Sequence, residues 1–137
     1  MKHNVIDGIC IPPYLVADIW PSVGPLIERA IVRGGINEFE DTEKEIHAGR
    51  MIMWAAWDGT RVLAVAVTQI AMIGGVKYGT IVALGGKELD RYAHLIEQLH
   101  GYFREHGCQR TRIIGRPGWA RLLPEYKVKS VVIEKVL

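Results

Sequence analysis

A pair of glycines that follows an apolar run is the best candidate in this chain for a ligand-binding site. Residues 78–84 are rich in β-branched side chains, and Gly85, Gly86 and Lys87 follow them directly. A helix is predicted from about residue 87 to residue 106, and a helix start offers free N–H groups to an anion. This strand, glycine turn and helix are typical of a phosphate-binding unit. The alternative is a sharp strand-to-helix turn that only glycine permits.

Three side chains elsewhere are candidates for proton transfer. Tyr126 can act as a general acid through its hydroxyl, or it can pack its ring at the edge of the domain. His47 and Glu45 lie near the end of a predicted second helix, and either can accept a proton. Histidine titrates close to neutral pH, which favours His47 for that role. The alternative for both is that they are solvated side chains on a surface helix.

No metal site is predicted. Cys10 and Cys108 lie far apart in the sequence and match no metal-ligand spacing. His94 and His100 have no cysteine or carboxylate partner at the spacing that a zinc site needs.

Composition limits the class of protein. A chain of 137 residues with 49% hydrophobic and 23% charged residues fits one globular domain, residues 1–137. The net charge of +2 is too small to favour nucleic acid as a partner. The longest strongly apolar run, residues 62–73, is too short to span a bilayer, and residues 1–10 do not read as a signal peptide. We therefore expect a cytoplasmic protein without a membrane partner.

Helices are predicted in the first third of the chain. An apolar stripe at helical spacing covers residues 11–33, and Pro21 and Pro25 within it should kink the helix or split it in two. A second, shorter helix should begin at Asp41 or Thr42 with a capping box and end at Gly49.

Strands dominate the rest of the chain. Residues 51–57 and 61–71 should form a hairpin around Asp58-Gly59, and residues 78–84 extend it to an antiparallel meander. After the long helix, a short strand should run parallel to residues 78–84, because a helical crossover joins parallel strands. The expected elements after this helix are a strand at 110–114, a short helix at 119–123 and a strand at 128–137. The predicted order is α-α-β-β-β-α-β-α-β, an α/β fold with a mixed, mainly antiparallel sheet of about six strands.

This order resembles the GNAT N-acetyltransferase fold over nearly the whole chain. Residues 53–59 followed by 62–68 look like the central hairpin of that family, and Leu84-Gly85-Gly86 sits where its acyl-CoA pyrophosphate loop belongs. Residues 107–108, 114–119 and 123–126 resemble small GNAT-like proteins encoded by phages and prophages.

The resemblance implies a function. GNAT proteins transfer an acyl group from acyl-CoA, such as acetyl-CoA, to an amine, and the acceptor here is unknown. In that family the fourth strand splays from the fifth, and a backbone N–H polarises the thioester carbonyl. The residues that the resemblance assigns to acyl-CoA are Val82, Leu84, Gly85, Gly86 and Lys87. Tyr126 and His47 are the corresponding catalytic candidates.

Two departures from the family pattern support a second hypothesis. The family loop reads Gln/Arg-x-x-Gly-x-Gly/Ala, whereas the glycines here are shifted and Glu88 and Asp90 follow them. The usual catalytic tyrosine falls at Pro124 by spacing, two residues from Tyr126. The second hypothesis is therefore a catalytically inactive GNAT-like phage or prophage protein, a virion or accessory component. It would act as a binding or assembly module, as a homo-oligomer or with another phage protein.

Overall fold

A computed structural model describes residues 7–34, 38–87, 91 and 93–137 of the chain. The first half holds strand β1 (Asp7–Ile11), helices α1 (Pro13–Gly34) and α2 (Phe39–His47), and strands β2 (Ile52–Trp57) and β3 (Val62–Ile73). The second half holds β4 (Val76–Gly86), the 3-10 helix η1 (Ala93–Leu95), α4 (Ile96–Glu105), β5 (Arg110–Ile113) and α5 (Gly118–Leu122).

The strands of this part of the chain form one sheet in the order β1-β2-β3-β4-β5. Strands β1 to β4 pair antiparallel, and β5 pairs parallel to β4. The predicted meander and the parallel crossover are therefore confirmed. Both tight turns contain glycines in the left-handed region, with φ of 99° at Gly59 and of 56° and 80° at Gly74 and Gly75. The hairpin at Asp58-Gly59 forms as its sequence predicts.

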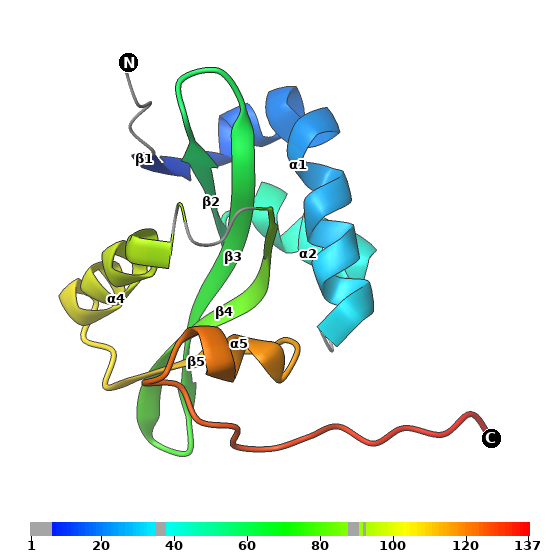
Figure 1. The fold of residues 1–137 in the computed structure, drawn as a ribbon, viewed down its shortest axis with the longest axis vertical. Helices are drawn as coiled ribbons and strands as arrows, with labels where there is room; N and C mark the ends of the chain where they lie inside the picture. The colour runs from blue at the N-terminus through cyan, green and yellow to red at the C-terminus, as the bar shows by residue number, and fades with distance from the viewer. Residues whose placement is uncertain (1–6, 35–37, 88–90, 92) are drawn as a thin grey trace.

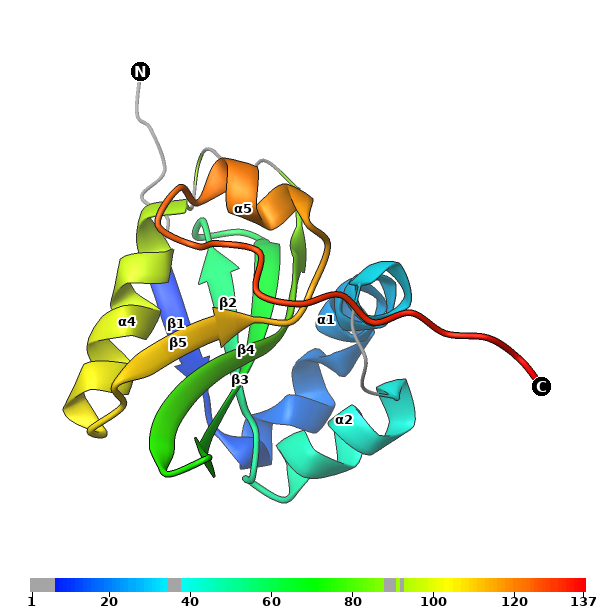
Figure 2. The same cartoon turned by 90° about the horizontal axis from the view of Figure 1, so that it is seen from below.

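Helices cover both faces of the sheet (Figures 1 and 2). Helices α1 and α2 lie on one face and α4 lies on the other, while α5 follows the end of β5. The core between the sheet and these two helices, α1 and α2, includes side chains from both layers: Val16, Val23, Ile27, Ile46, Met53, Val65 and Val82. The core between the sheet and α4 includes Trp54, Ala66, Ile81, Leu84, Leu99 and Phe103. The domain therefore has a core on each side of a single sheet.

The first strand was not predicted. Residues 7–11 pair with β2 from Asp7 opposite Trp57 to Ile11 opposite Met53. The segment is five residues long, and most of its side chains are exposed. Its strand conformation depends on the ladder with β2, so its own sequence carries little signal.

The predicted strand at residues 128–137 is wrong. The segment is extended, but it pairs with no strand of the described ranges and its side chains are exposed. The described sheet therefore has five strands, with one gained at the start of the chain and one lost at its end.

The two predicted helices at the start of the chain also differ in detail. Helix α1 is continuous over 22 residues and is not split at Pro21 or Pro25. Helix α2 begins at Phe39, earlier than expected, so Thr42 lies inside it. The hydroxyl of the buried Thr42 donates to the Glu38 carbonyl oxygen at 2.9 Å, which lies one turn earlier. Thr42 therefore does not cap the start of the helix.

No helix in the described ranges is long and apolar enough to cross a membrane.

Candidate functional site

Strand β4 contains a bulge at the middle of the sheet. Thr68 of β3 lies opposite Ile81, while its neighbour Val67 lies opposite Ala83, so Val82 is an extra residue. A bulge bends its strand and re-aims the residues that follow. Val82 accordingly packs into the core under α1, whereas Ile81 faces α4.

The parallel pairing of β4 with β5 ends at this bulge. The ladder runs from Tyr78 opposite Arg110 to Ile81 opposite Ile113, and the Ile114 N–H donates to the Ile81 carbonyl at 3.0 Å. Beyond these residues, β4 continues to Gly86 with β3 as its neighbour. From Val82 onward, the outer edge of β4 therefore no longer pairs with β5.

Backbone groups of β4 face this gap. The Lys87 N–H donates to the Leu63 carbonyl at 3.2 Å, which makes these two residues a hydrogen-bonded pair of the antiparallel ladder. Such pairs alternate with pairs whose N–H and C=O groups point away from the partner strand. By this alternation, Leu84 and Gly86 direct their N–H groups away from β3, toward the side that β5 has left.

A cavity of about 210 Å³ occupies this place. Its walls are the end of β4, the loop after β5, the start of α5 and one side of α1. The lining residues are Leu26, Arg29, Ala30, Leu84, Gly85, Gly86, Lys87, Ile114, Gly115, Arg116 and Trp119.

Three exposed cations surround the cavity. They are Arg29 of α1, Lys87 after β4 and Arg116 after β5, and the lining residues that the structure describes include no carboxylate. The Arg116 guanidinium lies 6.0 Å from the Trp119 ring centre, a cation–π contact that keeps it at the rim. This arrangement suits a ligand with phosphate groups.

Both predicted glycines line the cavity, but neither forms the expected turn. Gly85 and Gly86 are the last residues of β4, opposite Val65 and Ala64. A Cβ on Gly85 would lie 2.8 Å from the Leu26 carbonyl oxygen, so the missing side chain lets α1 approach the strand. Gly86 has a φ of 152° and likewise leaves no room for a side chain against β3. Packing explains why these positions are glycine.

The helix expected from about Lys87 is described only in part. Lys87 is not helical, and the helical residues that follow in the described part are Arg91, η1 and α4. Glu88, Leu89, Asp90 and Tyr92, on which the expected first turn rests, lie outside the described residues. Helix α4 itself begins at Ile96, which is not a lining residue of this cavity.

Tyr126 lies apart from the cavity lining. Its hydroxyl is 2.7 Å from His100 Nε2 and 3.3 Å from Thr111 Oγ1. His100 Nδ1 is in turn 2.8 Å from a Glu97 carboxylate oxygen, which lowers the Glu97 pKa. Burial raises the pKa of the Tyr126 hydroxyl. These contacts hold Tyr126 against α4 and β5.

His47 and Glu45 do not line the cavity either. His47 packs its ring 5.9 Å from the Trp20 ring, and its Nε2 lies 3.6 Å from Glu43. Glu45 accepts two hydrogen bonds from Arg50, at 2.7 and 3.0 Å, which lower the pKa of its carboxyl. A carboxylate engaged in this way is a weak proton acceptor.

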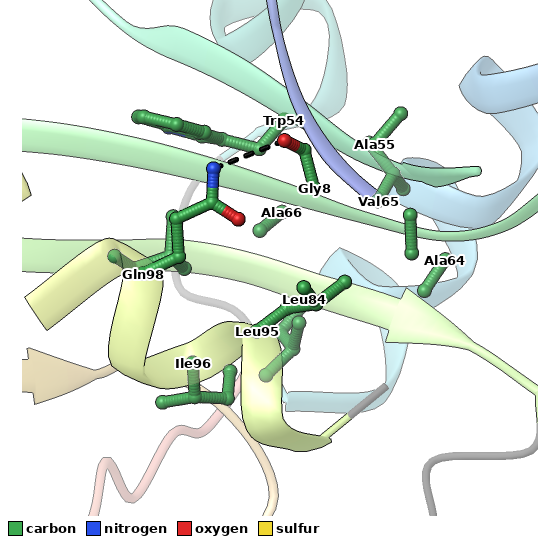
Figure 3. Close-up of a pocket in the computed structure, with 12 residues that line it drawn as sticks. Gly8, Trp54, Ala55, Ala64, Val65, Ala66, Leu84, Leu95, Ile96 and Gln98 are labelled. Atoms are coloured by element: carbon green, nitrogen blue, oxygen red, sulfur yellow. Dashed lines mark hydrogen bonds between the residues drawn. The ribbon is translucent and has the colours of Figure 1, made fainter. Parts of the chain in front are cut away.

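A second, smaller cavity of about 40 Å³ lies under α4 (Figure 3). Its walls are apolar, with Ala64 and Ala66 on the sheet and Leu95 and Ile96 from the helical side. Gln98 reaches across its edge and donates from Nε2 to the Gly8 carbonyl at 3.0 Å, as the dashed line shows. Leu84 lines this cavity as well as the larger one.

Comparisons with known proteins agree on the fold. No protein-family model matches the chain, and no curated protein matches it. A GNAT family acetyltransferase from Staphylococcus aureus matches with a TM-score of 0.66 and 10% identity, over 97% of this chain and 99% of that one. The chain has the GNAT fold.

Two further structures are similar to this chain. Glucosamine-6-phosphate N-acetyltransferase from Arabidopsis thaliana has a TM-score of 0.65 and 15% identity, over 96% of this chain and 97% of its own. An aminoglycoside N-acetyltransferase in complex with CoA has a TM-score of 0.68 and 11% identity, over 98% of this chain and 97% of its own. Identities this low show the GNAT fold and leave the activity open. None of these findings supports the phage association.

The GNAT resemblance did not identify the α1 side of the cavity. Leu26, Arg29 and Ala30 lie one helical turn apart, and two of them belong to the apolar stripe that predicted the helix. A cation at the border of such a stripe is the signal that points to Arg29. Arg116 stands in the loop after the predicted parallel strand, where the gap between β4 and β5 opens.

Among the residues that the structure describes, no group of three or more His, Cys, Asp or Glu side chains is placed to hold a metal ion.

Proposed function

We propose that this protein is an N-acyltransferase that transfers an acyl group from acyl-CoA, such as acetyl-CoA, to an amine. The observation that carries this proposal is the gap after the Val82 bulge. There, the N–H groups of Leu84 and Gly86 face a cavity of about 210 Å³ that three cations surround.

Each part of this gap suits one part of acyl-CoA. The pantetheine arm contains amide groups, which can pair with the free edge of β4 as a neighbouring strand would. The phosphates fit beside Arg29, Lys87 and Arg116, which attract them through charge and hydrogen bonds. A β4 N–H near the bulge would stabilise the oxyanion that forms when an amine attacks the thioester.

The reaction needs two proton movements. The amine nitrogen forms a bond to the thioester carbon, the C–S bond breaks, and the thiolate leaves. The amine loses a proton and the thiolate gains one. We propose Tyr126 and His47 as the proton-transfer groups; neither is a lining residue of the cavity.

The similar structures support the class of reaction. Their names include N-acetyltransferases for an aminoglycoside and for glucosamine-6-phosphate, and one of them holds CoA. Because those acceptors differ from each other, they do not point to one acceptor amine for this chain.

Ligand binding tests the proposal directly. Acetyl-CoA at a hundredfold excess over its Kd should stabilise the folded state by about 2.7 kcal/mol, seen as a rise in melting temperature. Arg116→Ala should weaken binding about fivefold to twentyfold in a calorimetric titration, because a hydrogen bond to a charged group is lost. Arg121→Ala is the matched control, since Arg121 is an exposed arginine of α5 that does not line the cavity.

Absence of heat and of a thermal shift at millimolar acetyl-CoA would reject an acyl-CoA site. Equal losses in the Arg116 and Arg121 variants would move the site away from this cavity.

A binding module without catalysis is the alternative that the contacts of Tyr126 favour. Its hydroxyl is already bonded to His100 and lies outside the cavity lining. Acetyl-CoA binding without release of free CoA, across a panel of amines that includes aminoglycosides and amino sugars, would favour the binding module. Release of CoA that depends on an amine would establish the transferase.

A further inference from the structure

Two arginines of β5 flank one aromatic ring of β4. In the parallel ladder, Arg110 lies opposite Tyr78 and Arg112 lies opposite Thr80. Arg110 Nη1 donates to the Tyr78 hydroxyl at 3.4 Å, and the Arg112 guanidinium carbon lies 5.5 Å from the centre of the Tyr78 ring. Arg112 Nε donates to Thr80 Oγ1 at 3.1 Å. We call these four residues the Tyr78 patch.

The Tyr78 patch lies on the face of the sheet that carries α1 and α2. The neighbouring residues of β4 face the other way, because a Cβ on Gly79 would collide with the Phe103 ring of α4 and Ile81 is buried in the core under α4. Successive side chains of a strand point to opposite faces, so Tyr78 and Thr80 point away from α4. Figure 2 shows α4 on one side of the sheet and α1 with α2 on the other. The patch and the α1 wall of the larger cavity therefore share one face.

The patch lies just before the Val82 bulge, where the proposed acyl transfer would take place. Thr80 precedes Val82 by two residues, which is a distance of about 7 Å along a strand. Acyl-CoA bound as proposed would occupy the edge of β4 from Val82 to Gly86 and present its thioester at the bulge. The buried core under α4 closes the other face at Ile81. An acceptor amine would therefore approach the thioester along the face that carries the Tyr78 patch.

The patch is strongly cationic. Both of its arginines are exposed, and residues 106–124 contain four arginines and no aspartate or glutamate. Among the described residues, no carboxylate forms an ion pair with Arg110 or Arg112. A guanidinium has several N–H donors, and the hydrogen bonds within the patch use one N–H of each arginine. The other donors can bind a carboxylate or a phosphate through paired hydrogen bonds.

We propose that the Tyr78 patch binds an anionic group of the acceptor, so that the acceptor is an amine that also carries a carboxylate or a phosphate. This acceptor class presupposes the acyl transfer proposed above. Arg110 and Arg112 hold the anion, and the amine reaches toward the bulge. The distance of about 7 Å between Thr80 and Val82 requires several bonds between the anion and the amine, as in 6-aminohexanoate or glucosamine-6-phosphate.

Matched pairs of amines test the acceptor class. Glucosamine-6-phosphate is compared with glucosamine, and 6-aminohexanoate with hexylamine, so that the members of each pair differ in the anion. In calorimetric titrations of the CoA-saturated protein, the anionic member should bind about tenfold tighter in at least one pair, because hydrogen bonds to a charged group are gained. The pair that shows the difference identifies the anion as a phosphate or a carboxylate.

Arginine variants locate the bound anion. Arg110→Gln and Arg112→Gln should each weaken binding of the anionic amine about fivefold to twentyfold, and they should not change binding of its counterpart without the anion. Arg104→Gln is the matched control, because Arg104 is an exposed arginine of α4 on the opposite face of the sheet. Circular dichroism checks that each variant is folded. Arg110→Gln carries the test alone if Arg112→Gln, which loses the bond to the buried Thr80, does not fold.

The outcomes separate this acceptor class from the acyl transfer itself. Binding of CoA with equal affinities inside both pairs of amines would overturn the acceptor class and leave the transferase in place. A preference for the anionic amine that survives both patch variants, or that falls equally with Arg104→Gln, would place the anion elsewhere. Failure of CoA and acetyl-CoA to bind would reject the acyl transfer, and the acceptor with it.

Discussion

Asp58 holds the β2–β3 hairpin through one carboxylate. Its Oδ1 accepts hydrogen bonds from the N–H groups of Thr60 and Arg61 and from the Thr60 hydroxyl, each at 2.9 Å. These bonds, from the Arg61 backbone first, lower the Asp58 pKa from 3.8 to about 2.

The lowered pKa predicts how stability depends on pH. A carboxyl whose pKa is lower in the folded state stabilises the fold above its unfolded value and loses that effect as pH falls through the folded value. Asp58→Asn should therefore melt below the natural protein at neutral pH, and the difference should shrink between about pH 4 and pH 2. Melting curves across this range measure it, and a difference that does not depend on pH would contradict the role of the charge.

Tyr126 has a structural role that can be separated from a chemical one. Tyr126→Phe removes the hydroxyl contacts to His100 and Thr111 and should lower the free energy of unfolding by about 1–2 kcal/mol. Acetyl-CoA affinity should stay within about twofold, because Tyr126 does not line the cavity. Urea denaturation and calorimetric titration measure the two quantities. If this variant loses the alkaline limb of the pH–rate profile, the result would support the proposed proton transfer by Tyr126, whereas an unchanged profile would leave its hydroxyl with the structural role alone.

At the scale of elements, the contact between α1 and β4 forms one wall of the candidate site. Gly85→Ala would place a Cβ 2.8 Å from the Leu26 carbonyl oxygen and 3.2 Å from the Ala30 Cβ. The helix would have to move outward, so we expect a loss of about 1–3 kcal/mol in the free energy of unfolding and weaker acetyl-CoA binding. Denaturant melts and titrations with acetyl-CoA measure these effects.

Gly101→Ala is the matched control for this change. Gly101 lies in α4, and a Cβ there meets no atom within 4 Å. Alanine should stabilise the protein by about 0.5–1 kcal/mol, because glycine is a poor helix former. Similar losses in both variants would argue against a close α1–β4 contact.

Elements whose signal is local could be predicted from the sequence. The turn at Asp58-Gly59, the apolar stripe of α1 and the periodic face of α4 depend on neighbouring residues, and their type and order are confirmed. Strand β1 and residues 128–137 depend on a partner strand instead. That residues 7–11 form a strand and residues 128–137 do not cannot be derived from the composition of the two segments, because a strand forms only where another strand pairs with it.

The site was predictable only in part for the same reason. The resemblance pointed to Val82 and to residues 84–87, and the larger cavity is lined by four of these five residues, from Leu84 to Lys87. The bulge at Val82 is a mismatch of register between two strands, which an evenly apolar run does not reveal. Arg29 reaches the cavity only because α1 packs against Gly85.

At the scale of the whole molecule, charge is distributed unevenly. The net charge is only +2, yet three cations lie around one cavity, and the described part of its lining has no carboxylate. Exposed charges are screened at ionic strengths near 1 M, where the Debye length is about 3 Å.

This distribution predicts a strong effect of salt on binding. Raising sodium chloride from about 0.01 M to about 1 M should weaken CoA binding at least tenfold. Pantetheine, which lacks phosphates, should bind weakly and with little dependence on salt. Titrations of both ligands at several salt concentrations measure this, and equal salt dependence would mean that the cations do not contact the phosphates.

Leu84 is a lining residue of both cavities. It borders the larger cavity beside α1 and the smaller apolar cavity beneath α4, and its side chain packs in the buried cluster under α4. One residue therefore borders both a chamber suited to a charged carrier and a chamber suited to a hydrocarbon chain.

Shortening the Leu84 side chain would enlarge the apolar cavity beneath α4. Leu84→Ala should cost about 2–5 kcal/mol of stability, and it should raise the affinity for butyryl-CoA relative to acetyl-CoA, because the longer acyl chain gains apolar space beside the site. Leu84→Met keeps a side chain of similar volume and should leave the ratio of affinities unchanged. An unchanged ratio in Leu84→Ala would show that the two compartments remain separate, whereas an altered ratio would make residue 84 a control point for acyl-chain length.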